Sequence, residues 1–580
     1  MKYYPRLSEI PTTREMVDVF RGYNHNLRIG DGEFYDMKNL SSANYPVLSP
    51  RPKRGVYASP AALGGMIGKD TLCYVDGSEF VIDDKRIEMG LKLGNTPKTL
   101  VSMGAYVIIM PDKKYINTED LSDYGNIEAG VTTSSTVTFT LCKNDGTAYE
   151  GVTVQDTAPK NPQNMALWID TSSVPHALKQ YSATSAMWVS VASTYIKISA
   201  TGIGEPFLDG DGISISGIAS PDLADLNSNM IILSRGDDYI VVTGILDKVT
   251  TQETPVVITR NMPTMDFIIE SENRLWGCRY GESITGEIVN EIYASKLGDF
   301  KNWNCFLGVS TDSYVASVGT DGPFTGAITH MGYPLFFKEG CMHKVYGNYP
   351  ATYQIQTTAC RGVQRGCSRS LAIVNEVLYY KARSAVCAYD GSLPVEISSA
   401  LGDVQYTAAV AGALGNKYYV SMLDTKNKHH LFVYDTVKGM WHREDNTKAR
   451  AFCNCRGELY YIDGEDNKIK TVLGSGELDN SPIQWMAETG VIGTDSPDKK
   501  YISRLDVRMY LDMGARAFFY IQYDSNGAWE HIYTANGNRL RSFSAPIRPQ
   551  RCDHLRLRIE GEGYANIYSI CKTIEQGSDI

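Results

Sequence analysis

The sequence predicts an all-β protein, and three observations indicate this fold class. Tyrosine is abundant, with 37 Tyr against 16 Phe, and 52 Gly are spread along the chain. Pairs of large aromatic residues recur in short apolar runs, and polar turn residues separate each run from the next. Aromatic side chains pack well on the pleated surface of a sheet, and glycine permits the tight turns between antiparallel strands. The 580 residues are enough for several domains.

A hairpin unit recurs along the chain. Its clearest copies begin at residues 377, 416 and 458, and each contains two adjacent tyrosines. A looser copy begins at residue 334. In chain order, these four starting points are 43, 39 and 42 residues apart. A second strand follows each run after a polar turn, which is the pattern of a hairpin. Weaker copies lie at residues 71–82 and 105–109. A period of roughly 40–50 residues with four short strands predicts a β-propeller, of about six to eight blades here.

Two further units interrupt or follow the repeat. Residues 117–205 are rich in Thr and Ser and alternate polar with apolar positions, which predicts a small β domain inserted into a propeller loop. After residue 477 the repeat stops, and strands are expected near 503–511, 517–523 and 555–560. The last of these alternates apolar with charged residues, as in a β-sandwich.

These features predict four segments. Residues 1–116 hold an N-terminal segment and the first blades, and residues 117–205 form the inserted domain. Residues 206–476 supply the remaining blades, and residues 477–580 form the C-terminal β-sandwich.

The charge balance gives no overall sign of nucleic-acid binding. The net charge is −10, from 66 acidic and 56 basic residues. It is uneven, because residues 499–558 carry eleven Lys/Arg and five Asp/Glu, a net of +6 that leaves −16 for the rest. Arg504, Arg508, Arg556 and Arg558 are candidate contacts for an acidic partner, although alternation on strands equally predicts a solvated face.

Neither a secretory signal nor a membrane-spanning segment is expected. The chain opens with polar sequence, and its apolar runs are much shorter than the ~20 residues that span a bilayer. The twelve cysteines lack a C-x-x-C pair, which favours buried thiols in a protein made in the cytoplasm.

A search for catalytic motifs finds none of the common ones. The sequence has no G-x-S-x-G, P-loop or H-E-x-x-H pattern. Residues 209–212 and 463–467 resemble calcium loops but lack the complete twelve-residue pattern, and hairpin turns use the same residue types. A carboxylate pair for glycoside hydrolysis could still be assembled from distant strands. The expectation is therefore a protein that is not an enzyme and has no metal site or cofactor.

Two stretches carry a resemblance to a known family. Residues 289–303 read VNEIYASKLGDFKNW and follow an apolar strand at 273–277. Residues 36–40 (DMKNL) precede the basic turn RPKRG at 51–55. Together they resemble the propeller core of bacteriophage tail nozzle and head-closure proteins, often described as stabilisation proteins. The order Arg-Pro-Lys-Arg-Gly departs slightly from the family's basic turn.

The resemblance implies a structural role in a virion. Copies of such a chain would form a homo-oligomeric ring below the portal or adaptor, continue or close the DNA channel, support DNA ejection, and carry fibres or a needle. Tyr293, Ser295, Gly298, Asp299 and Trp303 would define the fold rather than catalyse a reaction, with Asp299 capping a turn at Gly298. The acidic remainder of the chain would suit a lumen that repels DNA.

Two other functions remain open at this point. The first is a glycan-binding or glycan-cleaving propeller, such as a receptor-binding protein at the tail tip, which predicts an exposed aromatic cluster. The second is a monomeric intracellular scaffold that captures host proteins. The blade number, the ring stoichiometry and the role of the inserted domain are not predicted by the sequence.

Overall fold

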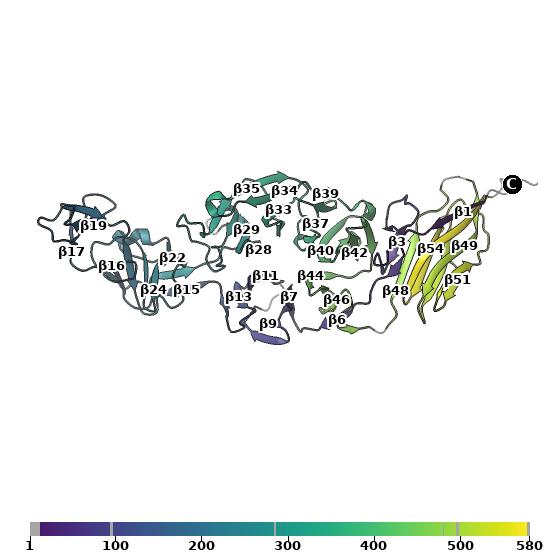
Figure 1. Ribbon diagram of the computed structural model, residues 1–580, viewed down its shortest axis with the longest axis horizontal. Helices are drawn as coiled ribbons and strands as arrows, with labels where there is room; N and C mark the ends of the chain where they lie inside the picture. The colour runs from purple at the N-terminus through teal and green to yellow at the C-terminus, as the bar shows by residue number, and fades with distance from the viewer. Residues whose placement is uncertain (1–11, 93–96, 284–285, 480, 495–497, 577–580) are drawn as a thin grey trace, which may run out of the picture.

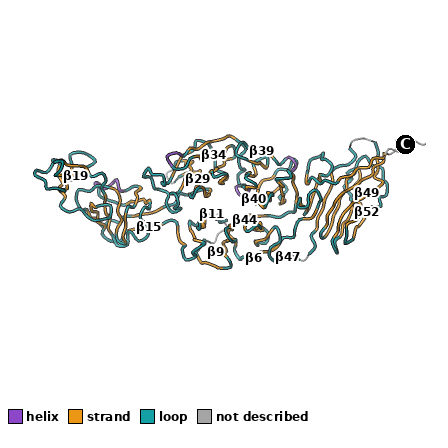
Figure 2. Tube along the Cα trace, viewed as in Figure 1, coloured by secondary structure: helices purple, strands orange, loops and turns teal. Residues whose placement is uncertain are grey.

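The computed structural model of the protein describes residues 12–92, 97–283, 286–479, 481–494 and 498–576. Within these ranges the chain is all-β, as predicted, and strands dominate the trace in Figure 2. The described helices are four 3-10 turns: η1 (Pro221–Leu226), η2 (Pro350–Thr352), η3 (Ser368–Ser370) and η4 (Ser399–Leu401). A search of the described residues found no helix of the length and apolar character that crossing a membrane requires.

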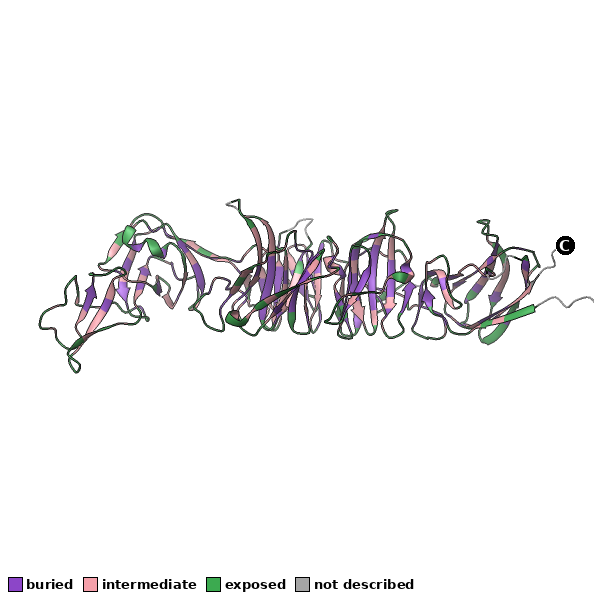
Figure 3. Ribbon diagram, turned by 90° about the horizontal axis from the view of Figure 1, so that it is seen from above, coloured by how far each residue is buried: buried purple, intermediate pink, exposed green. Residues whose placement is uncertain are grey.

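The molecule is elongated and consists of three parts in a row. Figure 1 shows a small β unit at one end, a large middle region, and a two-sheet unit at the end that carries the C-terminus. Buried residues concentrate in the strands of the middle region (Figure 3).

Seven antiparallel arrays of four strands make up the described middle region. The first two are β7 (Leu63–Gly68), β8 (Leu72–Asp76), β9 (Glu79–Ile82) and β10 (Lys85–Glu88), then β11 (Thr99–Met103), β12 (Tyr106–Met110), β13 (Lys114–Asn117) and β14 (Tyr124–Asn126). The next two are β28 (Phe267–Ser271), β29 (Arg274–Glu282), β30 (Ile288–Ala294) and β31 (Tyr314–Ser317), then β32 (Gly326–His330), β33 (Tyr333–Lys338), β34 (Cys341–Tyr346) and β35 (Gln354–Ala359). The last three are β36 (Ala372–Val374), β37 (Val377–Lys381), β38 (Val386–Tyr389) and β39 (Val395–Glu396), then β40 (Tyr406–Leu414), β41 (Lys417–Asp424), β42 (His429–Asp435) and β43 (Met440–Arg443), then β44 (Ala449–Cys455), β45 (Glu458–Asp463), β46 (Ile469–Thr471) and β6 (Gly55–Ala58), the last array continued by β47 (Glu477–Leu478).

The aromatic runs that defined the repeat occupy equivalent places in these arrays. The runs beginning near 334, 377, 416 and 458 form β33, β37, β41 and β45, each the second strand of its array. Tyr380 and Tyr418 are fully buried there. The repeat therefore marks the strand that is packed on both of its faces.

The first strands of the arrays lie against one another. β7 packs against β11, β11 against β28, and β28 against β32; farther along the chain β40 packs against β44, and β44 packs against β7. Between β32 and β40, the turn η3 contacts both strands. At the contact of β44 with β7, Gly68 approaches Asn454 so closely that an added Cβ would lie 2.2 Å from the Asn454 carbonyl oxygen.

The inserted unit differs in extent from the predicted residues 117–205. One of its sheets is β15 (Ala129–Thr132), β27 (Val257–Arg260), β22 (Gly212–Ser216) and β23 (Asn229–Ile231), and a second is β24 (Ser234–Gly236), β25 (Tyr239–Thr243), β21 (Tyr195–Ser199), β16 (Val137–Cys142) and β26 (Thr250–Gln252). A distal sheet holds β17 (Val152–Gln155), β18 (Leu167–Asp170), β19 (Ala177–Ser182) and β20 (Met187–Ser190). The unit thus runs from β15 to β27, because apolar strands beyond residue 205 pair with the Thr-rich strands before it.

The C-terminal unit borrows strands from the other end of the chain. One sheet is β1 (Thr12–Val17), β54 (Ala565–Gln576), β49 (Lys500–Leu511) and β52 (Leu540–Ala545). The second holds β2 (Gly22–Tyr23), β3 (Glu33–Lys38), β48 (Gln484–Thr489), β53 (Leu555–Glu562), β50 (Arg516–Tyr523) and β51 (Glu530–Asn536), and it continues through β43 into the array of β40, so that ten strands form one sheet. Both sheets contribute to one hydrophobic core, in which Val507 and Phe519 are buried.

The predicted N-terminal segment is therefore corrected. Residues 12–38 complete the C-terminal unit instead of opening the middle region, because β1 pairs with β54 and β3 pairs with β48. Residues 1–11 and 577–580 of the predicted segments lie outside the described residues. A short pair, β4 (Leu40–Ser41) and β5 (Ser49–Pro50), leads from this unit to β6.

Two buried histidines of the middle region make stability depend on pH. Burial and the nearby Lys417 charge lower the pKa of His442 to about 3. Burial and Lys338 lower the pKa of His343 to about 4. The unfolded chain, with histidine pKa values of about 6.5, takes up protons first as the pH falls. The free energy of unfolding should therefore fall from pH 6.5 towards pH 4, by up to about 1.4 kcal/mol per pH unit for each histidine.

Urea unfolding at pH 7, 6, 5 and 4.5 measures this slope. The His442→Gln variant should show a shallower decline than the parent protein over the same range. An identical slope in the two proteins would contradict the assignment of this proton uptake to His442.

Candidate functional site

The predicted motif at residues 289–303 lies where the middle region meets the inserted unit. Strand β30 carries Tyr293, whose hydroxyl donates a hydrogen bond to Glu291 at 2.6 Å. Ser295, fully buried, directly follows β30. Its Oγ accepts a hydrogen bond from the Leu275 N–H at 3.0 Å, and its own N–H donates to the Leu275 carbonyl at 2.8 Å. The serine thus holds the end of β30 on the start of β29.

Gly298 and Asp299 form the turn that follows. Gly298 has φ +72°, a conformation that favours glycine, and its N–H donates to the Asn273 carbonyl. The carboxylate of Asp299 accepts a hydrogen bond from the Lys301 N–H at 3.0 Å and another from the Asn302 side-chain amide at 2.6 Å. The predicted cap at Asp299 therefore acts on the residues after it.

Asn302 extends this turn into the inserted unit. Its side-chain NH₂ group also donates to Asp211 at 2.9 Å, and its side-chain oxygen Oδ1 accepts from the Gly212 N–H at 2.8 Å. Asp211 in turn pairs with Arg260, and both side chains are about 95% buried. Arg260 also donates to the carbonyl of Ile127, just before the inserted unit begins. A continuous polar chain therefore joins the motif to both connections of that unit.

Apolar packing reinforces the same joint. Trp303 is buried, and its indole N–H donates to the Phe300 carbonyl at 3.0 Å. It belongs to a hydrophobic cluster with Ile127 and Met262, one residue from each connection to the inserted unit. The predicted residues Tyr293, Ser295, Gly298, Asp299 and Trp303 thus lie together in one joint.

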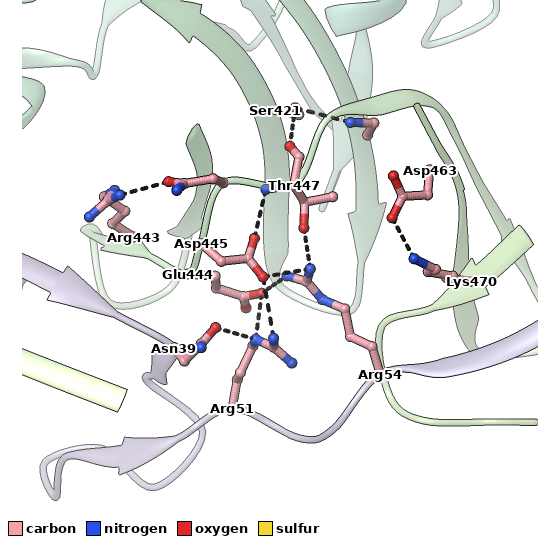
Figure 4. A network of polar contacts seen from close by, with 12 residues as sticks. Asn39, Arg51, Arg54, Ser421, Arg443, Glu444, Asp445, Thr447, Asp463 and Lys470 are labelled. Carbon is pink, nitrogen blue, oxygen red and sulfur yellow. Dashed lines mark hydrogen bonds and ion pairs between the residues drawn. The ribbon is translucent and has the colours of Figure 1, made fainter. Parts of the chain in front are cut away.

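The second motif forms another joint, shown in Figure 4. Arg51 and Arg54 precede β6, and their side chains contact the acidic pair Glu444 and Asp445, which follows β43. Arg54 contacts Glu444 and Asp445 at 2.7 Å each, and Arg51 contacts Asp445 at 3.3 Å. Arg51 also donates to Asn39 at 2.9 Å.

The four charges are largely shielded from water. The side chains of Arg51, Arg54 and Glu444 are between 5% and 11% exposed. Burial by itself would raise the pKa of Asp445, but the charges of Arg54 and Arg51 outweigh it and hold that pKa at about 2. Asp445 is therefore ionised near neutral pH, and buried charged groups of this kind need one another as partners. We call Arg51, Arg54, Glu444 and Asp445 the charge cluster.

A cavity of about 490 Å³ lies among the first strands of the middle region. Its described lining includes residues of β7, β11, β28, β32, η3 and β44. Three charged residues line it, and each has a partner: Lys98 pairs with Asp112, Asp266 with Arg279, and Arg369 donates to the Arg450 carbonyl. The size is that of a small-molecule pocket. Asp266 is the one carboxylate in the described lining, whereas glycoside hydrolysis needs a pair.

The four C-terminal arginines do not gather at one place. Arg556 and Arg558 lie on β53 and both pair with Glu488, at 3.3 and 2.7 Å. Arg504 and Arg508 lie on β49 in the other sheet, where they contact Asp506 and Ser542. Arg504 is 60% exposed, so it and Arg508 are the two that face solvent.

The calcium-like loops have other partners in the structure. Asp211 binds Arg260 and Asn302, and Asp463 pairs with Lys470 at 2.6 Å. Across the described ranges, no group of three or more His, Cys, Asp or Glu is arranged to hold a metal ion.

Sequence reasoning missed the acidic half of the charge cluster and the partners of Asn302. Asn302 belongs to the motif at residues 289–303, but nothing in the sequence indicated that its side chain would bind Asp211 and Gly212. Glu444 and Asp445 follow β43 without any pattern that distinguishes them from an ordinary polar turn. Arg260 and Asp211 lie in a stretch that was predicted to form blades.

Comparisons with known proteins give little further guidance. No family model matches the sequence, and no curated protein matches it. Among solved structures, the chain is similar to an exo-β-1,3-galactanase from Phanerochaete chrysosporium at 8% identity and a TM-score of 0.21, over 53% of this chain and 94% of the other. It is also similar to the Pyrococcus horikoshii acylaminoacyl peptidase (9%, TM-score 0.23, 54% and 55%) and to a Mycobacterium tuberculosis puromycin-hydrolyzing peptidase (9%, TM-score 0.24, 74% and 63%).

These comparisons correct one prediction. The expectation that the chain is not an enzyme is contradicted, because the galactanase and both peptidases are enzymes. At TM-scores below 0.25 the likeness assigns no activity or substrate to this chain.

The charge cluster predicts a large effect of removing Arg54. The Arg54→Met variant leaves Glu444 and Asp445 buried with Arg51 alone, and removing one partner of a buried ion pair costs about 3–5 kcal/mol. The free energy of unfolding of the middle region should fall by about that amount in urea titrations. Lys53→Met is the matched control, since the Lys53 ammonium makes an exposed hydrogen bond to the Asp479 carbonyl. Equal, small effects of the two substitutions would contradict the role given to the cluster.

Proposed function

We propose that the middle region is a seven-bladed β-propeller whose ring is closed by β6. Seven arrays of four antiparallel strands support the blade number. The contact of β44 with β7 supports closure, as does the pairing of β6 with β46, which places an N-terminal strand in the last array. Closure by a strand from the other end of the chain stabilises a propeller by tying its first and last blades together.

We propose further that the protein is a structural component of a phage tail, assembled as a ring below the portal or adaptor. The observation that carries this proposal is the position of the two motifs that resemble nozzle and head-closure proteins. Each lies at a joint: one connects the inserted unit to the propeller, and the other connects the propeller to the N-terminal strands. Motifs that set the angle between the parts of an elongated subunit suit a protein whose task is to build a ring.

The shape supports the same assignment. The inserted unit and the two-sheet unit extend from opposite ends of the propeller (Figure 1), so one subunit can contact different neighbours at its two ends. In this proposal, portal or adaptor proteins and fibre or needle proteins bind those ends, and copies of the chain meet side by side. The site of action is then the virion tail, after synthesis in the host cytoplasm.

Genomic DNA would pass between the copies. The cavity of about 490 Å³ in the middle region has the size of a small-molecule pocket, so we place the DNA outside it. The net charge of −16 outside residues 499–558 fits a lumen that repels the phosphate backbone and lets DNA slide.

Quantitative mass spectrometry of purified phage particles tests this function. The chain should be present in the particles at a copy number commensurate with the portal ring. Absence from particles, or a trace amount unrelated to the portal number, would refute the virion role.

A second candidate, glycan binding at the tail tip, is favoured by one specific feature. The distal sheet of the inserted unit carries Trp168, Tyr181 and Trp188 on one face, with ring centroids 5.3 and 5.4 Å apart around Trp188. Tyr181 and Trp188 are half-exposed.

If this candidate is right, the protein should bind specific sugars on a glycan array. The Trp188→Ala variant should lose that binding, and its copy number in the particles should stay the same as that of the parent protein.

A further inference from the structure

A serine, a histidine and an aspartate meet at the edge of the C-terminal unit. Strand β50 ends at Tyr523, β53 begins at Leu555, and these two residues are paired across the sheet. Ser525 lies in the turn after β50, and Asp553 and His554 come directly before β53. The pairing of the two strands therefore brings both short segments together.

The three side chains form a hydrogen-bonded series. The Ser525 hydroxyl lies 2.8 Å from Nε2 of His554, and Nδ1 of His554 lies 2.8 Å from Oδ2 of Asp553. In the tautomer with the proton on Nδ1, the imidazole donates to Asp553 and Nε2 accepts from the serine hydroxyl. A nucleophile within hydrogen-bond reach of a base that is itself oriented by a third group is the signature of an activated serine.

Backbone contacts fix this arrangement. The Asp524 N–H donates to the His554 carbonyl at 3.0 Å, and the Asp524 carboxylate accepts from the N–H groups of Asp553 and His554, at 2.7 and 3.3 Å. Asp524 and Ser525 have φ of +51° and +49°, which residues other than glycine rarely adopt. A serine on a sharp, strained turn directly after a strand presents its hydroxyl to solvent, as nucleophilic serines do in other hydrolases.

We propose that Ser525, His554 and Asp553 form a hydrolytic site for short carboxylic esters. Ser525 is the nucleophile, His554 the general base and acid, and Asp553 positions the imidazole. This activity is additional to the structural function proposed above and stands independently of it.

The reaction proceeds by acyl transfer to the serine. The Ser525 oxygen attacks the ester carbonyl carbon while His554 takes the hydroxyl proton. The bond between the carbonyl carbon and the alkoxy oxygen then breaks, and the alcohol leaves with the proton from His554. Water attacks the acyl-serine, again giving its proton to His554. The carboxylic acid is released, Ser525 regains its proton, and one ester and one water have become one acid and one alcohol.

The surroundings select the substrate class. Ser525 is exposed, and the side chains of His554 and Asp553 are 23% and 61% exposed, so the site is open to solvent. A site this exposed suits a short acyl group, such as acetyl, on a larger alcohol. No hydrogen-bond acceptor is recorded among the described residues for the N–H groups of Ser525 and Gly527, and in this proposal they are the candidate donors to the oxyanion.

A serine-directed fluorophosphonate probe tests the nucleophile in the full-length protein. Peptide mass spectrometry should find the label on Ser525. Two exposed serines serve as internal controls, since Ser122 and Ser392 donate to Asp120 and Asp390 with no imidazole as partner. Labelling of Ser525 at a rate equal to that of the two controls would overturn the proposal.

Hydrolysis of p-nitrophenyl acetate gives the second readout. Ser525→Ala should reduce hydrolysis to the level of buffer, and His554→Gln should lower kcat by about 10²-fold, the lower end for general base catalysis, since the site is wet. Asp553→Asn should lower kcat with KM unchanged, as expected of a residue that acts through His554. Ser392→Ala should retain the parent rate. Full hydrolysis by Ser525→Ala would overturn the proposal.

Discussion

The pairing of β6 with β46 is the interaction on which the rest of the structure depends. Gly55 lies opposite Thr471 in this ladder, more than 400 residues away along the chain. Closing so long a loop is entropically costly, and a few backbone hydrogen bonds on a four-residue strand would offset little of that cost. The charge cluster reinforces this pairing, because Arg51 and Arg54 precede β6 and pair with Glu444 and Asp445, which follow β43 in the neighbouring array. The cluster thus ties the start of β6, in the last array, to the end of the array of β40–β43.

Shared strands and buried polar contacts join the three parts of the molecule to one another. Strands β2 and β3 continue the array of β40–β43 into the C-terminal unit, so a single ten-stranded sheet crosses that boundary. At the other end, the chain from Asp299 through Asn302 and Asp211 to Arg260 fixes the inserted unit. Both joints use buried charged or amide groups, which must be paired to be tolerated. Such groups favour one geometry, because an altered arrangement would leave a buried charge or amide without its partner.

The sequence was sufficient to predict local structure. Adjacent aromatic residues, a phenylalanine pair in β33 and tyrosine pairs in β37, β41 and β45, marked the second strands, because most of these side chains are buried. The joint residues Tyr293, Ser295, Gly298, Asp299 and Trp303 were found through a motif, and they do lie together. Pairings between distant segments were not predictable: β1 with β54, β3 with β48, and β15 with β27 depend on contacts that no local pattern encodes. The same reason explains why Glu444 and Asp445 were missed, and why Ser525, His554 and Asp553 showed no motif.

The central claim is that the pairing of β6 with β46 holds the N-terminal strand firmly in the last array. Hydrogen exchange followed by mass spectrometry tests this claim most directly, because it compares the protection of β6 with that of β46 in the native protein. If β6 closes the middle region, the amides of both strands should be protected alike and should exchange together as urea is raised. They should lose that protection together in the Arg54→Met variant. Rapid exchange of β6 while β46 stays protected would contradict the account, because the N-terminal strand would then be a loosely attached edge.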